Sequence, residues 1–433
     1  MASLKEKIDN KSAVIAVLGL GYVGYPIASL FSNAGFRVIG YDVDISKVNV
    51  LGKRVNINGY APDINFIASN NSDILSKAEI YIIVVPTPLT KNDIPDMSYV
   101  ISASETIAKT LAKGKLVILV STTYPDTTEK VVKPILEKTG LIAGEDFYLC
   151  YCPERYSPGN PMMRIENIPH LVSGIDEESK ELAFNLYAKI LDQKNVIPVS
   201  SLKIAEASKI LENVFRNVNV ALINEIAKVF EKMEIDTWEV IQAASTKPGG
   251  FLAHYPGPGV GGHCIPLDPY YLYYIAMKYG MNCQFIQLAG EINRSMPYHI
   301  VYLIEEILKK VGKTLRFSKV SILGVTYKPN VDDTRESPTE VIIKELIQSG
   351  VDVTVFDPYT TESFGGRLAK NIEQAIKGQD CVALIVSHDK FHNIEEIINI
   401  NNPNICIVDA KNTINPNLLK STVKYRCLGK GSK

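Results

Sequence analysis

A cysteine in a glycine-rich segment is the residue of this chain best suited to covalent chemistry. Residues 248–268 read PGGFLAHYPGPGVGGHCIPLD, and this density of glycine and proline excludes a helix or an ordinary strand. Cys264 stands just before a helix that we expect to begin near Asp268. Since a helix N-terminus stabilises a nearby thiolate, Cys264 is a candidate nucleophile, and the alternative is a packing cysteine. His263 lacks a second His or Cys at ligand spacing, so we expect it to be structural or to contact substrate, and we expect no metal.

A second pattern is typical of dinucleotide binding. An apolar run at 14–18 leads into GLGYVG at 19–24, and helix-compatible sequence follows through Ala34. A strand predicted at 36–41 then ends in Asp42, which lies 18 residues beyond the last glycine. That order and spacing match the dinucleotide-binding fingerprint. The alternative is a plain strand–turn–helix with Asp42 as a solvated loop acid.

Each residue of this fingerprint has a physical task. Gly19 permits the tight turn, Gly21 lets a pyrophosphate approach the backbone, and Gly24 lets helix and strand pack closely. The helix N-terminus offers unpaired N–H groups to the phosphates. Asp42 would bind a ribose diol and repel a 2′-phosphate, so the sequence favours NAD over NADP.

Polar residues follow three further predicted strands, where ligands of parallel sheets gather. The strands are expected at 78–85, 116–120 and 148–152. Thr87, Thr122 and Glu154 follow them and are pocket candidates; each could equally be a turn residue. From 203 to 244 the pattern is helical, and Lys209 and Asn213 share one helix face. Spacing alone favours a solvated face for this pair over a donor pair in a cleft.

The last third repeats the strand–helix rhythm without the phosphate fingerprint. Strands are expected at 319–324, 351–357, 380–387 and 406–409, and the opening turn reads GVTYKP. Arg335, in the charged segment that follows, could reach a phosphate in a bidentate contact or belong to a surface salt-bridge cluster. The sequence thus predicts an α/β protein with two doubly wound, Rossmann-like domains joined by a long central helical region. We place the domains at 1–200, 201–310 and 311–433.

Composition excludes several classes of protein. Lys and Arg number 46 and Asp and Glu 47, so the net charge of -1 gives no general attraction to nucleic acid or membranes. No apolar run approaches a membrane span of about 20 residues, and the polar start lacks a signal core. Seven cysteines in 433 residues fit a reducing cytoplasm, and Cys150 and Cys152 are predicted to be buried on a strand. The basic tail at 420–433 is expected to be mobile.

Motifs along nearly the whole chain resemble those of the UDP-glucose/GDP-mannose dehydrogenase family. In order, they are GLGYVG, VPTP, ST with PDTT, CPER, the Lys209–Asn213 helix, GPGVGGHCIPLDPYYL and GVTYKPNVDDTRESP. The resemblance implies an NAD-dependent, four-electron oxidation of a sugar-nucleotide C6 alcohol to a carboxylate. It also implies a homodimer formed through the central helices and a role in making precursors of cell-surface polysaccharides or other glycans.

The resemblance also assigns roles to single residues by position. The catalytic set is the nucleophile Cys264, the acid Asp268, the oxyanion pair Lys209 and Asn213, the water-orienting Thr122 and the acid/base Glu154. Cofactor contacts are implied for Gly19, Gly21, Tyr22, Val23, Gly24, Asp42, Thr87, Thr122 and Arg335. Contacts to the UDP-sugar are implied for Glu154, Arg155, Lys209, Asn213, Phe251, Tyr255, Gly261, His263 and Lys328.

Two departures from the glucose-specific members concern the substrate. Leu267 stands where those members commonly have lysine, and Pro158 where they have a second glutamate. Both changes resemble the N-acetylhexosamine branch, so we expect UDP-GlcNAc or UDP-ManNAc as substrate, with UDP-glucose or GDP-mannose as the alternative. Two other functions stay open: a two-electron dehydrogenase of small hydroxy acids, and an NAD-binding redox sensor without turnover.

Overall fold

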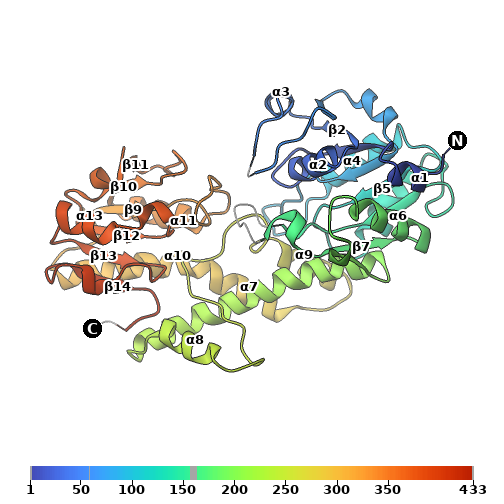
Figure 1. The fold of residues 1–433 in the computed structure, drawn as a ribbon. Helices are drawn as coiled ribbons and strands as arrows, with labels where there is room; N and C mark the ends of the chain where they lie inside the picture. Colours follow the sequence, from blue (N-terminus) through green and yellow to red (C-terminus); the bar gives the residue numbers. More distant parts are fainter. Residues whose placement is uncertain (1, 58, 157–162, 432–433) are drawn as a thin grey trace. The chain divides into compact units, whose positions relative to one another are not determined.

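A buried strand and a glycine turn begin the first sheet, as the sequence predicts. The computed structural model describes residues 2–57, 59–156 and 163–431 (Figure 1), so Pro158 lies outside the described part. Strand β1 (Val14–Leu18) is followed by α2 (Gly24–Asn33) and by β2 (Arg37–Tyr41), which pairs in parallel with β1. The carboxyl end of β1 therefore meets the N-terminus of α2 at the predicted dinucleotide turn.

Eight strands form this sheet in the order β3-β2-β1-β4-β5-β6-β7-β8. The remaining six are β3 (Phe66–Ser69), β4 (Ile80–Ile83), β5 (Leu116–Leu119), β6 (Tyr148–Tyr151), β7 (His170–Gly174) and β8 (Val196–Pro198). Neighbours are parallel except β6 and β7. Since the chain crosses from one side of β1 to the other between β3 and β4, the loops after β1 and β4 border the switch point where such sheets bind ligands.

Helices cover the sheet because each carries an apolar stripe. They are α1 (Leu4–Asp9), α3 (Ile45–Leu51), α4 (Ser98–Ala108), α5 (Lys133–Glu137) and α6 (Glu177–Tyr187), with α2 packed on β1 and β2 and α6 on β6, β7 and β8. Short 3-10 turns lie at Ser72–Lys77, Ile165–Asn167 and Gln193–Asn195, and a π-helical turn lies at Thr128–Val132.

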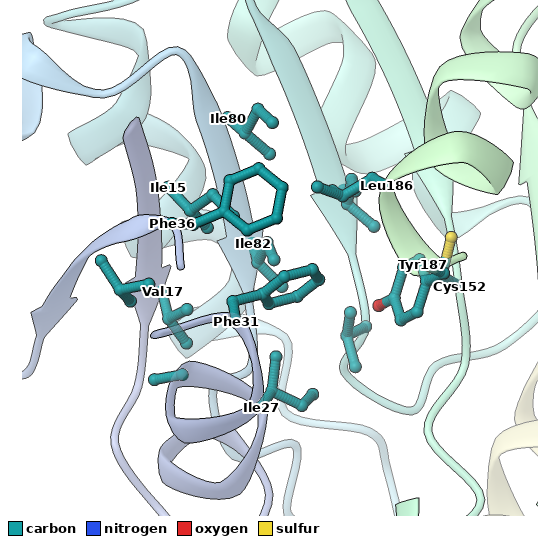
Figure 2. Close-up of a cluster of buried hydrophobic side chains, with 14 of the residues drawn as sticks. Ile15, Val17, Ile27, Phe31, Phe36, Ile80, Ile82, Cys152, Leu186 and Tyr187 are labelled. Atoms are coloured by element: carbon teal, nitrogen blue, oxygen red, sulfur yellow. The ribbon is translucent and has the colours of Figure 1, made fainter. Parts of the chain in front are cut away.

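Aromatic rings fill the core between these layers. Figure 2 shows Phe31 of α2 beside Phe36, and the two rings meet edge to face with centroids 5.9 Å apart. Tyr187 of α6 packs on Phe31 in the same manner at 6.0 Å. Cys150 and Cys152 are 0% and 1% exposed, which confirms that both are packing residues.

Long helices follow the first sheet. They are α7 (Leu202–Lys232), α8 (Thr237–Ser245), α9 (Asp268–Lys278) and α10 (Gln284–Lys310). The chain forms two units, Met1–Glu212 with Tyr270–Met281 and Asn213–Pro269 with Asn282–Lys433. The three domain ranges expected from the sequence stay a prediction.

The second sheet has six parallel strands in the order β11-β10-β9-β12-β13-β14. They are β9 (Lys319–Leu323), β10 (Asp352–Phe356), β11 (Arg367–Leu368), β12 (Cys381–Leu384), β13 (Cys406–Asp409) and β14 (Lys424–Cys427). Helices α11 (Pro338–Gln348), α12 (Ile372–Ile376) and α13 (Ile394–Asn401) alternate with them, with 3-10 turns at Asp389–Phe391 and Pro416–Leu418. The α/β class with two doubly wound sheets and a central helical region is thereby confirmed.

The expected mobile tail is wrong for the described residues. Its segment 424–427 forms β14, and Leu428 is fully buried. Leu428 O accepts a hydrogen bond from the indole of Trp238, and Gly429 N donates to Glu231 on α7. The basic composition misled the prediction because the basic residues Lys424 and Arg426 themselves pair with β13, at Cys406 and Val408.

Candidate active site

The glycine turn leaves an open approach to the backbone. Gly19 has φ +97°, and a Cβ there would lie 2.4 Å from Val84 O. A Cβ on Gly24 would lie 1.9 Å from Gly19 O, whereas one on Gly21 would meet nothing within 4 Å. Gly19 and Gly24 are thus required by packing, and the space beside Gly21 is free for a ligand.

The surroundings of this turn fit a dinucleotide. Tyr22 is exposed, and Val23, the N-cap of α2, makes no side-chain capping bond, so its own N-cap side chain does not occupy the helix N-terminus at which a phosphate would bind. Asp42 directly follows β2, is 7% exposed, and accepts a hydrogen bond from Leu20 N at 2.9 Å. An acidic side chain beside this turn is the group that would hold a ribose diol of NAD.

Two loops at the switch point are tied to each other and to α9. Ser121 Oγ, after β5, accepts from Val85 N at 2.9 Å and donates to Val85 O at 2.8 Å, after β4. The hydroxyl of Tyr271 on α9 donates to Thr87 O. The half-buried Thr122 therefore stands on a loop whose start is fixed against the Thr87 loop.

A buried glutamate that the motifs did not reveal supports the Thr122 loop. Glu206 on α7 is fully buried and accepts hydrogen bonds from Asp126 N at 2.7 Å, Thr128 N at 2.8 Å and the Thr128 hydroxyl at 2.7 Å. Asp126 has φ +80°, a strained backbone for a non-glycine residue. Burial raises the pKa of Glu206 to about 7, against the opposing effect of these hydrogen bonds.

Glu154 and Arg155 follow β6. One carboxylate oxygen of Glu154, Oε1, accepts from the backbone N–H groups of Arg155 and Tyr156, both at 2.7 Å. The other, Oε2, is buried and accepts no hydrogen bond within the described part of the chain. Arg155 is held by Glu212 of α7, with contacts of 3.1 and 2.7 Å. Oε2 of Glu154 thus keeps the capacity to accept a hydrogen bond.

The predicted nucleophile lies beside two of its predicted partners. Cys264 is exposed, and its carbonyl accepts from Asp268 N at 2.8 Å at the start of α9. Asp268 is 3% exposed, and its Oδ2 accepts from Asn213 Nδ2 at 2.5 Å. Lys209 stands one turn before Asn213 on α7 and is 7% exposed. The structure thus gathers Asn213, Asp268 and Cys264, and puts Lys209 on the same helix face as Asn213.

The glycine-rich loop rests on the opening turn of the second sheet. Gly262 N donates to Arg335 O at 3.2 Å. A Cβ on Gly261 would lie 2.7 Å from Glu336 O, and one on Gly262 2.7 Å from the Tyr327 ring. These glycines allow a closeness of approach that no other residue permits. The guanidinium of Arg335 donates to both carboxylate oxygens of Asp333, at 2.7 and 2.5 Å. A contact between Arg335 and the cofactor stays a prediction.

Charged groups of this turn act on the loop. Partial burial lowers the pKa of Lys328, and the negative charges of Asp333 and Cys264 act in the opposite direction. Partial desolvation and the nearby Arg335 lower the pKa of His263. Lys328 thus lies within electrostatic range of Cys264.

Two predicted substrate contacts lie at the start of this loop. Phe251 is 42% exposed and Tyr255 46% exposed. The Tyr255 ring stacks on Trp238 of α8 with centroids 5.5 Å apart and planes at 21°. Tyr255 is thereby fixed in place while one part of it stays open to solvent.

A carboxylate of the second sheet occupies the position that Asp42 has in the first. Asp357 directly follows β10, and its Oδ2 accepts from Val325 N at 2.7 Å, next to Gly324. Here the acid is closed off, because Oδ2 also contacts His388 Nε2 at 3.0 Å and both side chains are fully buried. His388 Nδ1 in turn accepts from Asn330 N at 3.0 Å, so the pair braces the turn that carries Lys328.

No group of three or more His, Cys, Asp or Glu side chains suited to a metal occurs among the described residues. Within the same part of the chain, no helix has the length and apolarity needed to cross a membrane.

Comparisons with known proteins give the same picture along most of the chain. Family models of UDP-glucose/GDP-mannose dehydrogenases match at residues 13–191 (NAD binding domain), 203–295 (central domain) and 321–416 (UDP binding domain).

Individual relatives match over nearly their full length. The UDP-N-acetyl-D-mannosamine dehydrogenase of Methanocaldococcus jannaschii is 36% identical over 96% of both chains. The UDP-N-acetyl-D-glucosamine 6-dehydrogenase of Pseudomonas aeruginosa is 35% identical over 89% of this chain and 92% of the relative. The solved structure of UDP-D-ManNAc dehydrogenase from Pyrococcus horikoshii has a TM-score of 0.84 at 32% identity, covering 96% and 99%. The chain therefore belongs to the UDP-glucose/GDP-mannose dehydrogenase family and is an NAD-dependent nucleotide-sugar 6-dehydrogenase.

Proposed function

We propose that this enzyme oxidises the C6 hydroxyl of a UDP-N-acetylhexosamine, UDP-ManNAc or UDP-GlcNAc, to the uronic acid. The relatives named for these two sugars support the substrate class, as does Leu267 in place of the lysine common in glucose-specific members. UDP-glucose or GDP-mannose is the alternative. The uronic acid would serve the synthesis of cell-surface polysaccharides or other glycans.

The observation that carries the chemistry is that Cys264 is exposed and its carbonyl accepts from Asp268 N at the start of α9, where Asp268 in turn accepts from Asn213. NAD, when bound at the glycine turn of the first unit, accepts a hydride in each of two oxidations. In the first, water held by Asp268 accepts the proton of the C6 hydroxyl as C6 loses its hydride. The Cys264 sulfur then adds to the resulting aldehyde, and the carbonyl oxygen takes up a proton to give a thiohemiacetal.

The second oxidation and hydrolysis complete the reaction. The thiohemiacetal loses a hydride from C6 and its hydroxyl proton, which leaves a thioester on Cys264. Lys209 and the amide of Asn213 stabilise the oxyanion, an effect of about 3 kcal/mol per donor in comparable sites. Water activated by Glu154 adds to the thioester carbonyl, and the S–C6 bond breaks to release the carboxylate. Thr122 orients water. One alcohol and one water thus yield one acid and two NADH.

Substrate and stoichiometry test the proposal together. UDP-ManNAc, UDP-GlcNAc, UDP-GalNAc, UDP-glucose and GDP-mannose are each assayed for NADH formation. We expect two NADH per molecule of a UDP-N-acetylhexosamine. One NADH per substrate would exclude the four-electron reaction, and preference for UDP-glucose or GDP-mannose would transfer the proposal to that sugar.

Replacing the thiol tests the nucleophile. Cys264→Ser should stop turnover at or before thioester release, whereas Cys283→Ser, a half-buried cysteine at the start of α10, should leave it unchanged. Uronic acid formation by Cys264→Ser at the wild-type rate would refute the assigned role.

We also propose that the enzyme is a homodimer formed through α7. Three apolar side chains project into solvent from this helix at spacings of seven residues, Phe215, Leu222 and Val229, and Met233 follows directly beyond the end of the helix. They are 48%, 54%, 48% and 58% exposed. Such a stripe is the pattern by which two helices pack against each other.

A further inference from the structure

The loop that carries Cys264 has a composition that does not hold a single conformation by itself. Between Gly257 and Ile265 it contains Gly259, Gly261 and Gly262. Glycine loses more conformational freedom on ordering than any other residue. A nucleophile must lie within a few tenths of an ångström of its working position, so such a loop needs external anchors.

Two asparagines of α7 bind the two ends of this loop. Asn224 Oδ1 accepts from Gly257 N at 2.9 Å. Asn217 Nδ2 donates to Ile265 O at 2.9 Å, one residue beyond Cys264. Both bonds join side chain to backbone, so they fix the path of the main chain whatever the loop side chains do.

A third asparagine, Asn293 of α10, couples the two anchors. Asn224 Nδ2 donates to Asn293 Oδ1 at 3.0 Å, and Asn293 Nδ2 donates to Asn217 O at 3.1 Å. Gly257 N sets the direction of this chain of bonds, because it must meet an oxygen, which leaves Asn224 Nδ2 to donate to Asn293 Oδ1 and turns Asn293 Nδ2 toward Asn217 O. Asn224 and Asn293 therefore each have one orientation that makes these bonds, and Ile265 O fixes that of Asn217, whose Oδ1 is buried without a hydrogen-bond partner among the described residues.

Burial makes these bonds obligatory. Asn217, Asn224 and Asn293 are 2%, 0% and 2% exposed. A buried amide or N–H that loses its partner costs free energy and is not replaced by bulk water. Asn219, two residues from Asn217 on the same helix, differs: it is partly exposed, and its side chain donates to Phe215 O of its own helix.

We propose that Asn217, Asn224 and Asn293 are positioning residues that hold the Cys264 loop at both ends. This rests on the proposed function, since it gives Cys264 the role of nucleophile. The three asparagines touch neither sulfur nor sugar in this assignment. They act through Gly257 and Ile265, which set where the thiol lies.

The test compares Asn217→Ala and Asn224→Ala with Asn219→Ala as the matched control. For each full-length variant, kcat and KM are measured with the nucleotide sugar that gives the most NADH in the substrate assay. The affinities for NAD and UDP are measured as well. The rate of iodoacetamide alkylation at Cys264 is followed by peptide mass spectrometry. We expect kcat to fall about tenfold to a hundredfold in the first two variants. KM and both affinities should stay within threefold, and the alkylation rate should change at least threefold.

Two results would contradict the positioning role, and a third would contradict the proposed function alone. If both variants keep kcat and the alkylation rate within twofold of wild type, the positioning role is wrong. If Asn219→Ala changes both as strongly, the effect belongs to the helix rather than to the anchors, and the role is equally wrong. If Cys264→Ser is fully active, the proposed function fails by itself.

Smaller polar replacements guard against loss of folding. Should an alanine variant lose NAD binding, Asn217→Ser and Asn224→Ser are judged by the same criteria. Asn224→Asp keeps the acceptor for Gly257 N, so its kcat should lie nearer the wild-type value than that of Asn224→Ala. The reverse order would count against the anchor at Gly257.

Discussion

The buried Glu206 makes the stability of the first unit depend on pH. Its carboxylate accepts three hydrogen bonds from residues 126–128 and has no contact with solvent. The carboxylate of Asp126 nearby stays ionised, because Lys130 and Lys203 lie 2.7 and 2.6 Å from it. The perturbation is Glu206→Gln, which keeps the shape and removes the titration.

The size of the effect follows from the pKa. Burial raises the pKa of Glu206 from 4.5 to about 7 in the folded state. At 1.36 kcal/mol per pKa unit, this corresponds to about 3 kcal/mol. Because the folded state holds its proton more tightly, the contribution is complete below pH 4.5 and is lost as the pH rises through 7. Relative to Glu206→Gln, the wild type should therefore lose about 3 kcal/mol between pH 4.5 and 8.

Urea denaturation followed by circular dichroism, at half-unit steps of pH, measures this difference. Hydrogen exchange of peptides covering residues 116–137 shows whether the loss lies in the Thr122 loop. Glu181→Gln on α6, where the carboxylate is 60% exposed, is the control and should follow the wild type. A wild-type minus Glu206→Gln difference that stays constant within about 1 kcal/mol across this range would refute the reasoning.

Three further predictions concern the cofactor and the assembly. Gly21→Ala should leave the melting temperature nearly unchanged, since the added Cβ meets no protein atom, and should raise KM for NAD because the Cβ occupies space left for the cofactor. Gly24→Ala should prevent folding of the turn, because its Cβ would lie 1.9 Å from Gly19 O, and thermal melts measure both effects. Asp42→Ser should raise KM for NAD and lower KM for NADP, so unchanged values for both cofactors would exclude a ribose contact. Leu222→Glu should convert a dimer to a monomer in sedimentation velocity, while a dimer retained in that variant would place the interface elsewhere.

Strong local patterns made most of the fold predictable. The strands at 14–18 and 406–409 have the predicted bounds because apolar β-branched runs end at glycine or at a buried acid. Other strands are shorter than expected, such as β4, which ends at Ile83 rather than Val85. There the backbone of Val85 bonds to Ser121 of a neighbouring loop, a contact that hydrophobicity cannot reveal.

The supporting residues of the site could not be read from the sequence. Asn217 and Asn224 lie in a helix where polar side chains usually face water, and their partners stand 48 and 33 residues away. Glu206 gives no signal either, because the N–H groups that donate to its carboxylate belong to Asp126 and Thr128, which stand 80 and 78 residues earlier in the sequence. Residues that perform chemistry recur in recognisable motifs, whereas those that hold a loop depend on which segments the fold brings together.

Residues 426–429 supply buried partners to side chains of α7 and α8 that stand 190 to 198 residues earlier in the sequence. Glu231 of α7 is buried with Arg426 and Gly429 as partners, and the indole of Trp238 donates to Leu428 O. During synthesis these groups of α7 and α8 stay hydrated until residues 190 and 198 positions further along the chain have been added. The first sheet, whose last strand ends at Pro198, can therefore form before the buried partners of Glu231 and Trp238 exist.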